Sequence, residues 1–299
     1  MGSFPGVSVV IPTLNAESEL SGLLRVLKRQ TLCPEEIIVV DSSSDDLTGE
    51  IAEDDPSVTL IRIDRGDFNH GATRDMAFRR SSGDLVCFLT QDAVPVSDAY
   101  LERLVAPLLS DDGIALVSGR QLPKPDARRF EQLVRAFNYP EESSVRSVTD
   151  LPRLGIKTFF ASDVCSAYRR SAYLACGGFP RLETNEDMLM AARFIEAGYK
   201  VAYEASAEVY HSHNLTICQQ FNRNRMVGRF LASHASELMG ALEFGEGARL
   251  AKSVADILLR EGNLLELLAF GADCAARLLG NRAGRLDAES DTRGNAGMV

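Results

Sequence analysis

Two runs of β-branched residues joined by a helical stretch constrain the fold of this chain more than any other feature. Residues 7–15, VSVVIPTLN, form a continuous apolar run of the kind found in strands covered on both faces. Leucines then recur at helical spacing between residues 20 and 27, and a second buried run, EEIIVVD, stops at Asp41. This order predicts a β-α-β unit.

The alternation of strands and helices continues toward residue 120. The sequence predicts strands near 57–63, 84–90 and 114–119, with helices after Gly71 and from Asp98. Alternating elements of this length predict an α/β fold with a Rossmann-like, mostly parallel sheet flanked by helices on both faces. Ligands of such sheets bind beyond the carboxyl ends of the strands.

The second half of the chain is less regular. Residues 159–179 predict a loop or short strand, a helix and a Gly-Gly turn. Residues 183–213 predict a helix followed by two short strands that end at His211 and His213.

The sequence becomes helical from about Leu215, with a glycine-rich interruption near 240–247. The polar tail after Arg285 has the composition of a disordered segment. We therefore predict a catalytic domain at residues 1–235 and a helical C-terminal extension at 236–299.

Charge and composition exclude several classes of protein. The 32 Lys and Arg against 42 Asp and Glu give a net charge of −10, which argues against an extended nucleic-acid surface. The six scattered cysteines form no C-x-x-C pair and no signal segment precedes them, so we expect reduced thiols in the cytoplasm. The most apolar stretch, residues 263–280, is interrupted by Glu266, Asp273 and Arg277 and is a poor membrane span.

Polar residues follow the predicted strands at the points where they end, and these residues should share one rim. They are Thr13 and Asn15, Asp41, Asp64 and Asp67, and Gln91 and Asp92. The packet DFNHGATRD, residues 67–75, follows the third strand and belongs to this rim.

Each single motif has a structural alternative. Asp41 lies where nucleotide-binding folds place an acid that contacts a ribose, but Asp41 or residues 42–44 also suit a helix cap. No G-x-G-x-x-G follows the first strand, which argues against a nicotinamide or flavin. Asp92, in TQDA, suits a divalent cation bound to a diphosphate, and it equally suits a turn.

Two later motifs are equally ambiguous. Asp187 lies in the first turn of a helix, either as a general base or as the partner of Thr184 in a capping box. His211 and His213 lie two apart on a predicted strand, either as ligands of Mn or Zn or as surface residues. Near them in sequence, a cluster of arginines suits either phosphate or solvent: Arg223, Arg225 and Arg229.

The order of the motifs is more informative than any one of them. IPTLN, VVDSSSDDLT, NHGATRD, QDA, GGF, NED and VYHSH follow one another in a way that resembles the inverting glycosyltransferases of family 2, which have the GT-A fold. FNHGATRD, TQDA and VYHSHN look more narrowly like the bacterial rhamnosyltransferases of that family, which build O-antigen or other cell-surface polysaccharides from dTDP-rhamnose. The resemblance covers about residues 7–230.

The resemblance implies a role for each matched residue. The nucleotide-sugar would be bound by Pro12, Thr13, Asn15, Asp41, Ser43, Asn69, His70, Arg74, Gln91 and Asp92. Mn or Mg would be held by Asp92, His211 and His213, and Asp187 would be the catalytic base. Asp163, Glu186, Arg225 and Arg229 would lie on the acceptor or phosphate side.

The chain departs from the family pattern at three places. The usual D-x-D metal motif is reduced to Gln91-Asp92-Ala93, which implies a weak or dispensable metal. The usual Asp-Asp-Gly-Ser is Asp41-Ser42-Ser43-Ser44, and the Asn that usually follows Arg74 is Asp75.

The acceptor and the C-terminal helices are left open by the sequence. A surface glycan implies a glycan or lipid-linked acceptor, and leucines between 258 and 268 would pack on the catalytic domain, pair with a second subunit or contact a membrane peripherally. Alternatives to the rhamnosyl donor are a UDP-hexose, a nucleotidyltransferase activity and a non-catalytic nucleotide-sugar binder. A nucleotidyltransferase usually has a glycine-rich basic loop after the first strand, and PTLNAESEL lacks it.

Overall fold

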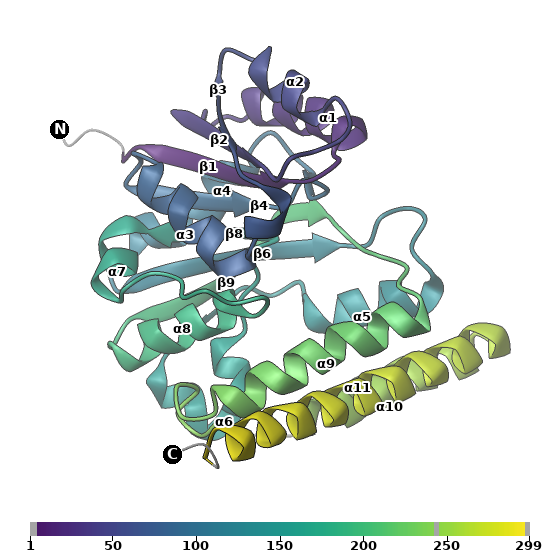
Figure 1. Cartoon of the computed structure of the whole chain (residues 1–299). Coiled ribbons are helices and arrows are strands. Elements are labelled where there is room, and N and C mark those ends of the chain that lie inside the picture. Colours follow the sequence, from purple (N-terminus) through teal and green to yellow (C-terminus); the bar gives the residue numbers. More distant parts are fainter. Residues whose placement is uncertain (1–4, 242–244, 297–299) are drawn as a thin grey trace.

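The computed structural model describes residues 5–241 and 245–296 (Figure 1). Its strands are β1 (Val7–Thr13), β2 (Glu36–Asp41), β3 (Val58–Arg62), β4 (Leu85–Leu89), β5 (Val94–Pro95), β6 (Ile114–Leu122), β7 (Ser144–Arg146), β8 (Cys165–Arg169) and β9 (Lys200–Tyr210). Within the described ranges they form one sheet in the order β3-β2-β1-β4-β8-β6-β9-β5, with β7 paired to β9. The pairs β3-β2-β1-β4 and β6-β9 are parallel, while β8 runs antiparallel to both of its neighbours. The predicted mostly parallel α/β sheet is confirmed.

Helices cover both faces of this sheet, and the last helices of the chain form a layer beyond it (Figure 1). They are α1 (Glu17–Lys28), α2 (Thr48–Glu53), α3 (His70–Arg80), α4 (Tyr100–Ser110), α5 (Arg129–Asn138), α6 (Leu151–Leu154), α7 (Arg170–Ala175), α8 (Glu186–Glu196), α9 (Ile217–Ser233), α10 (Glu246–Arg260) and α11 (Leu264–Ala296). Three short 3₁₀ turns join them at Arg65–Asp67, Val148–Asp150 and Gly155–Phe159.

Alternation along the buried strands divides the core between the two faces. Val9 and Ile11 of β1 point to the cluster that contains the leucines of α1 and α4. Val10, between them, points to the opposite cluster with Phe78 of α3 and Leu189 of α8. Because both faces are covered, the strands are apolar throughout, as the sequence pattern predicts.

The carboxyl ends of the parallel strands meet at one edge of the sheet. Thr13 pairs with Asp41, and Asp41 pairs with Arg62, so the first three strands end in register. The loops after these strands therefore begin at a common rim, as predicted.

The last two strands predicted from the sequence are one strand in the structure. β9 runs without interruption from Lys200 to Tyr210. Its pairing with β6 shifts register between Gly119 and Arg120, as at a β-bulge. The prediction of two short strands was wrong, because residues 200–210 stay paired with β6 on both sides of this shift. His211 and His213 lie just beyond the strand.

Helices α9 and α11 lie against each other over much of their length (Figure 1). A Cβ atom on Gly228 would lie 2.1 Å from the Asn281 carbonyl oxygen, and one on Gly284 would lie 1.8 Å from the Arg225 oxygen. The two backbones therefore approach as closely as glycine permits. A satellite core of Phe130, Leu258 and Phe270 joins α5, α10 and α11.

The C-terminal extension differs in one respect from the prediction. The tail after Arg285 is not disordered up to Ala296, because α11 continues to that residue. Asp287 and Asp291 form ion pairs with Arg225 and Arg229 of α9, which favours the ordered helix. The division of the chain at residue 235 stays a prediction. In the ranges that the structure describes, no helix combines the length and apolar character that crossing a membrane requires.

Candidate active site

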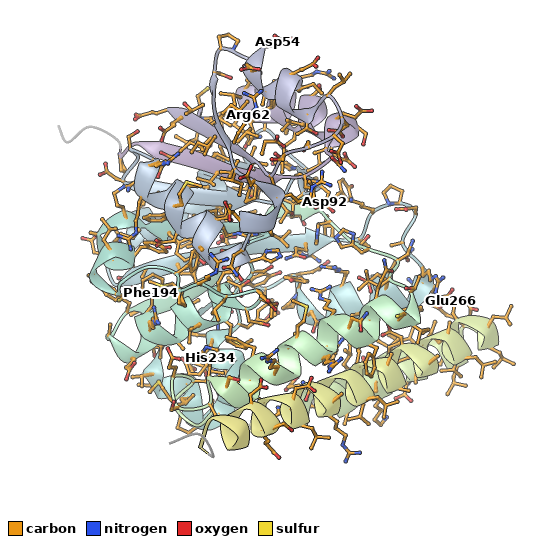
Figure 2. All side chains as sticks on the ribbon, in the orientation of Figure 1. Asp54, Arg62, Asp92, Phe194, His234 and Glu266 are labelled. Atoms are coloured by element: carbon orange, nitrogen blue, oxygen red, sulfur yellow. The ribbon has the colours of Figure 1, made fainter. Side chains whose placement is uncertain are left out.

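A cleft of about 520 Å³ opens at the rim formed by the strand ends. Seven predicted site residues line it: Pro12, Thr13, His70, Arg74, Gln91, Asp92 and His213. Figure 2 places Asp92 on the side of the molecule to which the arrowheads of β6 and β9 point in Figure 1. The structure thus brings residues from four separate segments, each at or after the end of a strand, to one surface.

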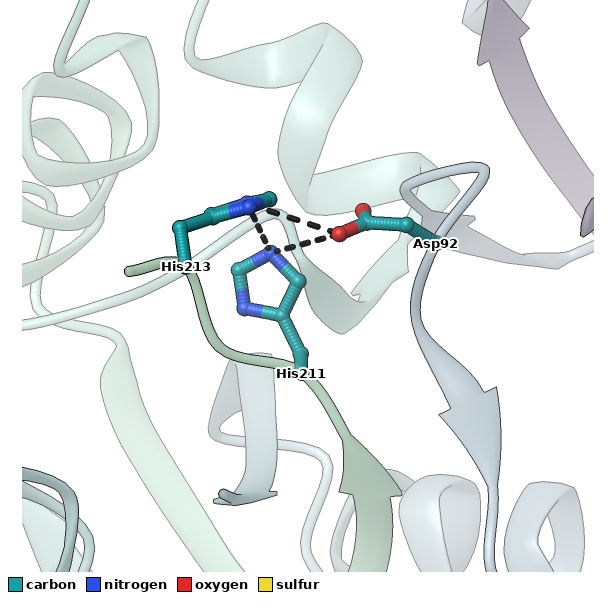
Figure 3. Close-up of side chains that lie close together, drawn as sticks. All are labelled: Asp92, His211 and His213. Atoms are coloured by element: carbon teal, nitrogen blue, oxygen red, sulfur yellow. Dashed lines mark hydrogen bonds and ion pairs between the residues drawn. The ribbon is translucent and has the colours of Figure 1, made fainter. Parts of the chain in front are cut away.

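Asp92, His211 and His213 converge at one end of this cleft (Figure 3). The Asp92 Oδ2 atom lies 3.5 Å from His211 Nε2 and 3.4 Å from His213 Nε2, and the two Nε2 atoms are 3.1 Å apart. Strand pairing brings them together, because Val94 in β5 pairs with Tyr210 at the end of β9. The predicted ligand set is therefore assembled in space although 119 residues separate Asp92 from His211.

The tautomer of His211 is fixed by its neighbours. Gln121 Oε1 accepts a hydrogen bond from Arg135 Nη1, which identifies it as the amide oxygen. His211 Nδ1, 3.0 Å from the same oxygen, must therefore carry the proton and donate it. The lone pair of His211 Nε2 consequently points toward Asp92, as in a metal-binding histidine whose second nitrogen is held by an outer partner.

The protonation states also suit a cation. Burial, only partly offset by the Asp92 charge, lowers the pKa of His211 to about 3, so the ring is neutral near pH 7. Burial would raise the pKa of Asp92, but the attraction of the neighbouring groups, the Lys124 ammonium among them, outweighs burial and holds that pKa below its ordinary value. An ionised carboxylate and two neutral imidazoles fit Mn or a similar divalent metal.

Lys124 is a cleft residue that the sequence analysis missed. Its Nζ donates to Asp92 Oδ2 at 3.2 Å, so a lysine ammonium lies beside the three predicted metal ligands. Lys124 lies two residues after the end of β6. The sequence analysis looked for polar residues after the first four strands, and the same search after the strand predicted at residues 114–119 would have found it. The other missed lining residues are Leu14, Glu19, Ser42, Arg65, Phe68 and Thr90.

Arg74 connects the cleft to a buried group of carboxylates. Its Nη1 donates to Glu186 Oε1 at 2.8 Å, and its Nε lies 3.8 Å from Asp163 Oδ2. Arg74 Nη1 also lies 3.0 Å from His70 Nδ1. Since a guanidinium only donates, Nδ1 of His70 accepts, and the neutral ring carries its proton on Nε2. Burial, together with the Arg74 charge, lowers the pKa of His70 to about 4.

Asp187 lies next to Glu186 at the start of α8. Its Oδ2 accepts a hydrogen bond from the Asp163 backbone N–H at 3.2 Å. Burial, reinforced by the charges of Glu186 and Asp163, raises the pKa of Asp187 well above its ordinary value. Burial is also the main cause that raises the pKa of Asp163 to about 6. A carboxyl group in such surroundings is a better proton acceptor than one in water.

The capping-box alternative for Asp187 is wrong. Helix α8 begins at Glu186, and its N-cap is Asn185, which has φ 60° and makes no side-chain cap. The Thr184 hydroxyl donates to the Asn185 side chain instead. Asp187 therefore does not owe its position to a capping role.

Four predicted nucleotide contacts do not line the cleft with their side chains. Asn15 Oδ1 accepts from the Asp45 N–H at 2.9 Å, and Asp41 Oδ2 accepts from the Ser44 N–H at 3.3 Å. The Ser43 hydroxyl donates to the Ile63 carbonyl at 2.8 Å.

Asn69, the fourth of these residues, is the N-cap of α3. Its Oδ1 accepts from the Ala72 N–H at 3.0 Å. All four side chains thus order the loops that carry the cleft residues. Gln91 lines the cleft and also orders a loop, since its amide makes two hydrogen bonds to the backbone of Leu14.

A second cleft, of about 780 Å³, lies between the segment 181–184 and helices α9 and α11. Arg225 and Arg229 line it, and each forms an ion pair with an aspartate of α11, Asp287 and Asp291. The arginines are therefore neither simply solvated nor free for phosphate. Gly71 N–H donates to the Leu182 carbonyl at 3.0 Å, so the segment that lines this second cleft also contacts the start of α3 at the first.

Known proteins resemble this chain in sequence and in fold. A sequence profile described as glycosyl transferase family 2 matches residues 8–176. The O-antigen chain rhamnosyltransferase RfbN of Salmonella typhimurium is 43% identical over 260 residues, which cover 85% of this chain and 82% of that one. The O-antigen chain rhamnosyltransferase WbaN of Salmonella anatum is 41% identical over 263 residues, covering 86% and 82%.

Among solved structures, the mannosyltransferase PcManGT from Pyrobaculum calidifontis, in complex with GDP-Man and Mn²⁺, has a similar fold. The superposition has a TM-score of 0.63 at 19% sequence identity and covers 96% of this chain and 88% of that one.

Proposed function

This chain belongs to glycosyl transferase family 2 and has the GT-A fold, and from that premise we propose that it transfers L-rhamnose from dTDP-rhamnose, with inversion, to a hydroxyl of a growing surface polysaccharide or its lipid-linked precursor. The observation that carries the proposal is the convergence of Asp92, His211 and His213 at a cleft whose inner wall, through Arg74, reaches the carboxylates around Asp187. The two rhamnosyltransferase relatives favour the rhamnosyl donor.

The donor would lie in the cleft of about 520 Å³. Pro12 and Thr13 border the space for the nucleoside, and Asp92, His211 and His213 would hold Mn or Mg at the diphosphate. Such an ion supplies electrostatic stabilisation of the charge on the leaving diphosphate. The protein adds cationic or donor groups of its own on the same surface, namely Lys124, Arg65 and the Nε2–H of His70.

Asp187 would act as the base in a single displacement. The acceptor oxygen forms a bond to the anomeric carbon while the bond from that carbon to the diphosphate oxygen breaks, and dTDP leaves with the electron pair. The hydroxyl proton passes to a carboxylate oxygen of Asp187. Attack from the face opposite to the leaving group inverts the anomeric centre.

The acceptor would enter through the second cleft. The segment 181–184 lines that cleft and leads directly into α8, which carries Asp187. Polar side chains beside Met226 and Phe230 give a surface suited to sugar rings. Arg225 and Arg229 are paired with aspartates there, which favours neutral saccharide units over a phosphate as the group bound at this point.

A donor screen tests the proposal. Nucleotide release would be measured with dTDP-rhamnose, UDP-glucose, UDP-galactose and GDP-mannose, each with a lipid-linked oligosaccharide acceptor and Mn²⁺. We expect release from dTDP-rhamnose to exceed the others. Preference for a UDP-hexose would support the alternative donor, and release from none of them would contradict a transferase.

Replacing Lys124 with Met separates its effects on metal and nucleotide. Mn²⁺ alone should raise the melting temperature of the variant more than that of the unchanged protein, because Asp92 loses its competing ammonium. Binding of dTDP without metal should weaken by about tenfold or more, since a charged hydrogen bond contributes about 1.5–3 kcal/mol, while dTMP should bind equally. Lys252→Met, at an exposed site on α10, is the control. Equal responses of both variants would contradict a diphosphate contact by Lys124.

A further inference from the structure

The outer face of α11 carries a stripe of exposed leucines. The side chains of Leu264, Leu265, Leu268, Leu278, Leu279 and Leu286 are between 57% and 82% exposed. The inner face of α11 packs on α9 and α10, and Figure 1 shows α11 along the outer edge of the molecule. Of the six leucines predicted to pack, Leu258 is buried and Leu267 packs against the satellite core, whereas the others are 55–82% exposed, namely Leu259, Leu264, Leu265 and Leu268. A contiguous apolar surface of this kind marks an interaction site.

The spacing of this stripe is that of a helix that pairs with another helix. Positions 264, 271 and 278, positions 265, 272, 279 and 286, and positions 268, 275 and 282 repeat every seven residues on the exposed face. Between Leu264 and Leu286, Arg282 is the one charged residue among the exposed positions of α11. Sustained seven-residue repeats of this type are packed in coiled-coil fashion.

The stripe is nearly symmetric about its centre. Leu265 and Leu279 each lie seven residues from Ala272, and the residues around the centre, Gly271 and Ala275, are also small. An antiparallel second copy of the helix, related by a two-fold axis near Ala272, would place Leu265 beside its Leu279, and its Leu278 at the level between Leu264 and Leu268. The small central residues permit close approach. Such a patch is complementary to itself, which a two-fold interface requires.

We propose that α11 pairs antiparallel with α11 of a second copy of this chain to form a two-fold dimer. The same register places Arg282 opposite residue 262, just before α11 of the other copy begins, so the one charge on the stripe lies outside the overlap of the two helices at residues 264–280. A membrane surface fits less well, because interfacial helices carry a strongly basic polar face and this chain has a net charge of −10. The inference is independent of the donor and acceptor assigned above.

The mass in solution tests the pairing. Light scattering coupled to gel filtration should give twice the 32.6 kDa chain mass for the unchanged protein. Leu265→Glu should give the single-chain mass with an unchanged melting profile, because this side chain is exposed in the single chain and the change would bury a carboxylate against Leu279 of the second copy. Leu174→Glu, at an exposed leucine of α7, should remain dimeric. A single-chain mass for the unchanged protein at tens of micromolar would overturn the proposal.

Cysteine cross-linking tests the antiparallel register. In a parent carrying Cys33→Ser and Cys218→Ser, Ala272→Cys should form a disulfide-linked dimer, because the axis passes near residue 272. Leu286→Cys should not, since the two sulfurs would be about 40 Å apart at 1.5 Å per residue. Cross-linking at both positions would indicate parallel helices and overturn the register. Leucine-dependent binding to anionic phospholipid vesicles by a monomeric protein would assign the stripe to a membrane instead.

Discussion

Asp187→Asn should abolish sugar transfer while leaving nucleotide binding nearly unchanged. An amide occupies the same space as the carboxylate but does not accept the acceptor proton, and loss of a general base typically lowers the rate by about 10²–10⁴-fold. The affinity for dTDP with Mn²⁺ should stay within about twofold, because Asp187 does not line the donor cleft. Initial rates of transfer and calorimetric titration with dTDP measure the two effects separately.

The control and the pH profile exclude a merely structural role. Glu196→Gln, at the exposed end of α8, should transfer normally. The rate of the unchanged enzyme should fall as acid protonates Asp187. The midpoint of this fall should lie above the ordinary Asp pKa of 3.8, because burial and the Glu186 and Asp163 charges raise the pKa of Asp187. Normal transfer by Asp187→Asn would remove the base from the mechanism.

Arg74→Met should cause the largest loss of stability of any single change considered. Arg74 is 5% exposed, and its guanidinium faces Glu186 and Asp163, so its removal leaves buried carboxylates uncompensated. Breaking a buried pair in this way costs about 3–5 kcal/mol of unfolding free energy. Arg79→Met, on the same helix but with a half-exposed side chain paired to Asp75, should cost less than about 1 kcal/mol. Urea unfolding at pH 7 measures both.

The loss in Arg74→Met should shrink as the pH is lowered. Burial raises the folded-state pKa of Asp163 to about 6, against 3.8 for an ordinary Asp, even with Arg74 present. The folded chain therefore binds more protons than the unfolded chain between these values, so this group favours the folded state increasingly as pH falls through about 6 toward 4. Without Arg74 the effect is larger. Equal losses for the two arginine variants, or a loss independent of pH, would contradict the role of Arg74 as a counter-charge.

The parallel half of the fold and the position of the cleft follow from local patterns. The apolar runs that end at Thr13, Asp41 and Leu89 are strands β1, β2 and β4. The polar residues at or after these ends lie at one edge of the sheet, because parallel strands end together. Periodicity and strand-end chemistry are properties of short segments, so they are visible without the tertiary structure.

The contacts that complete the site are long-range and have no local signal. His211 meets Asp92 because β5 pairs with β9 in one register, and Arg74 meets Glu186 across 112 residues. The residues that line the cleft were predicted best where a side chain had no nearby backbone group to bond. Asn69 and Asp41 do not line the cleft, since short polar side chains readily bond to the backbone of their own loops.

The glycine contacts between α9 and α11 make the two sides of α11 unequal in the substitutions they tolerate. Where α11 packs on α9, even one methyl group on Gly228, Gly280 or Gly284 would collide with a carbonyl of the opposite helix. On the side of α11 that faces α9, these glycines therefore do not tolerate substitution. The opposite side is free to exchange one apolar residue for another. Proteins that evolve from this chain should therefore keep the three glycines while their leucines vary, so the surface that α11 presents to other molecules can change without altering the wall of the second cleft.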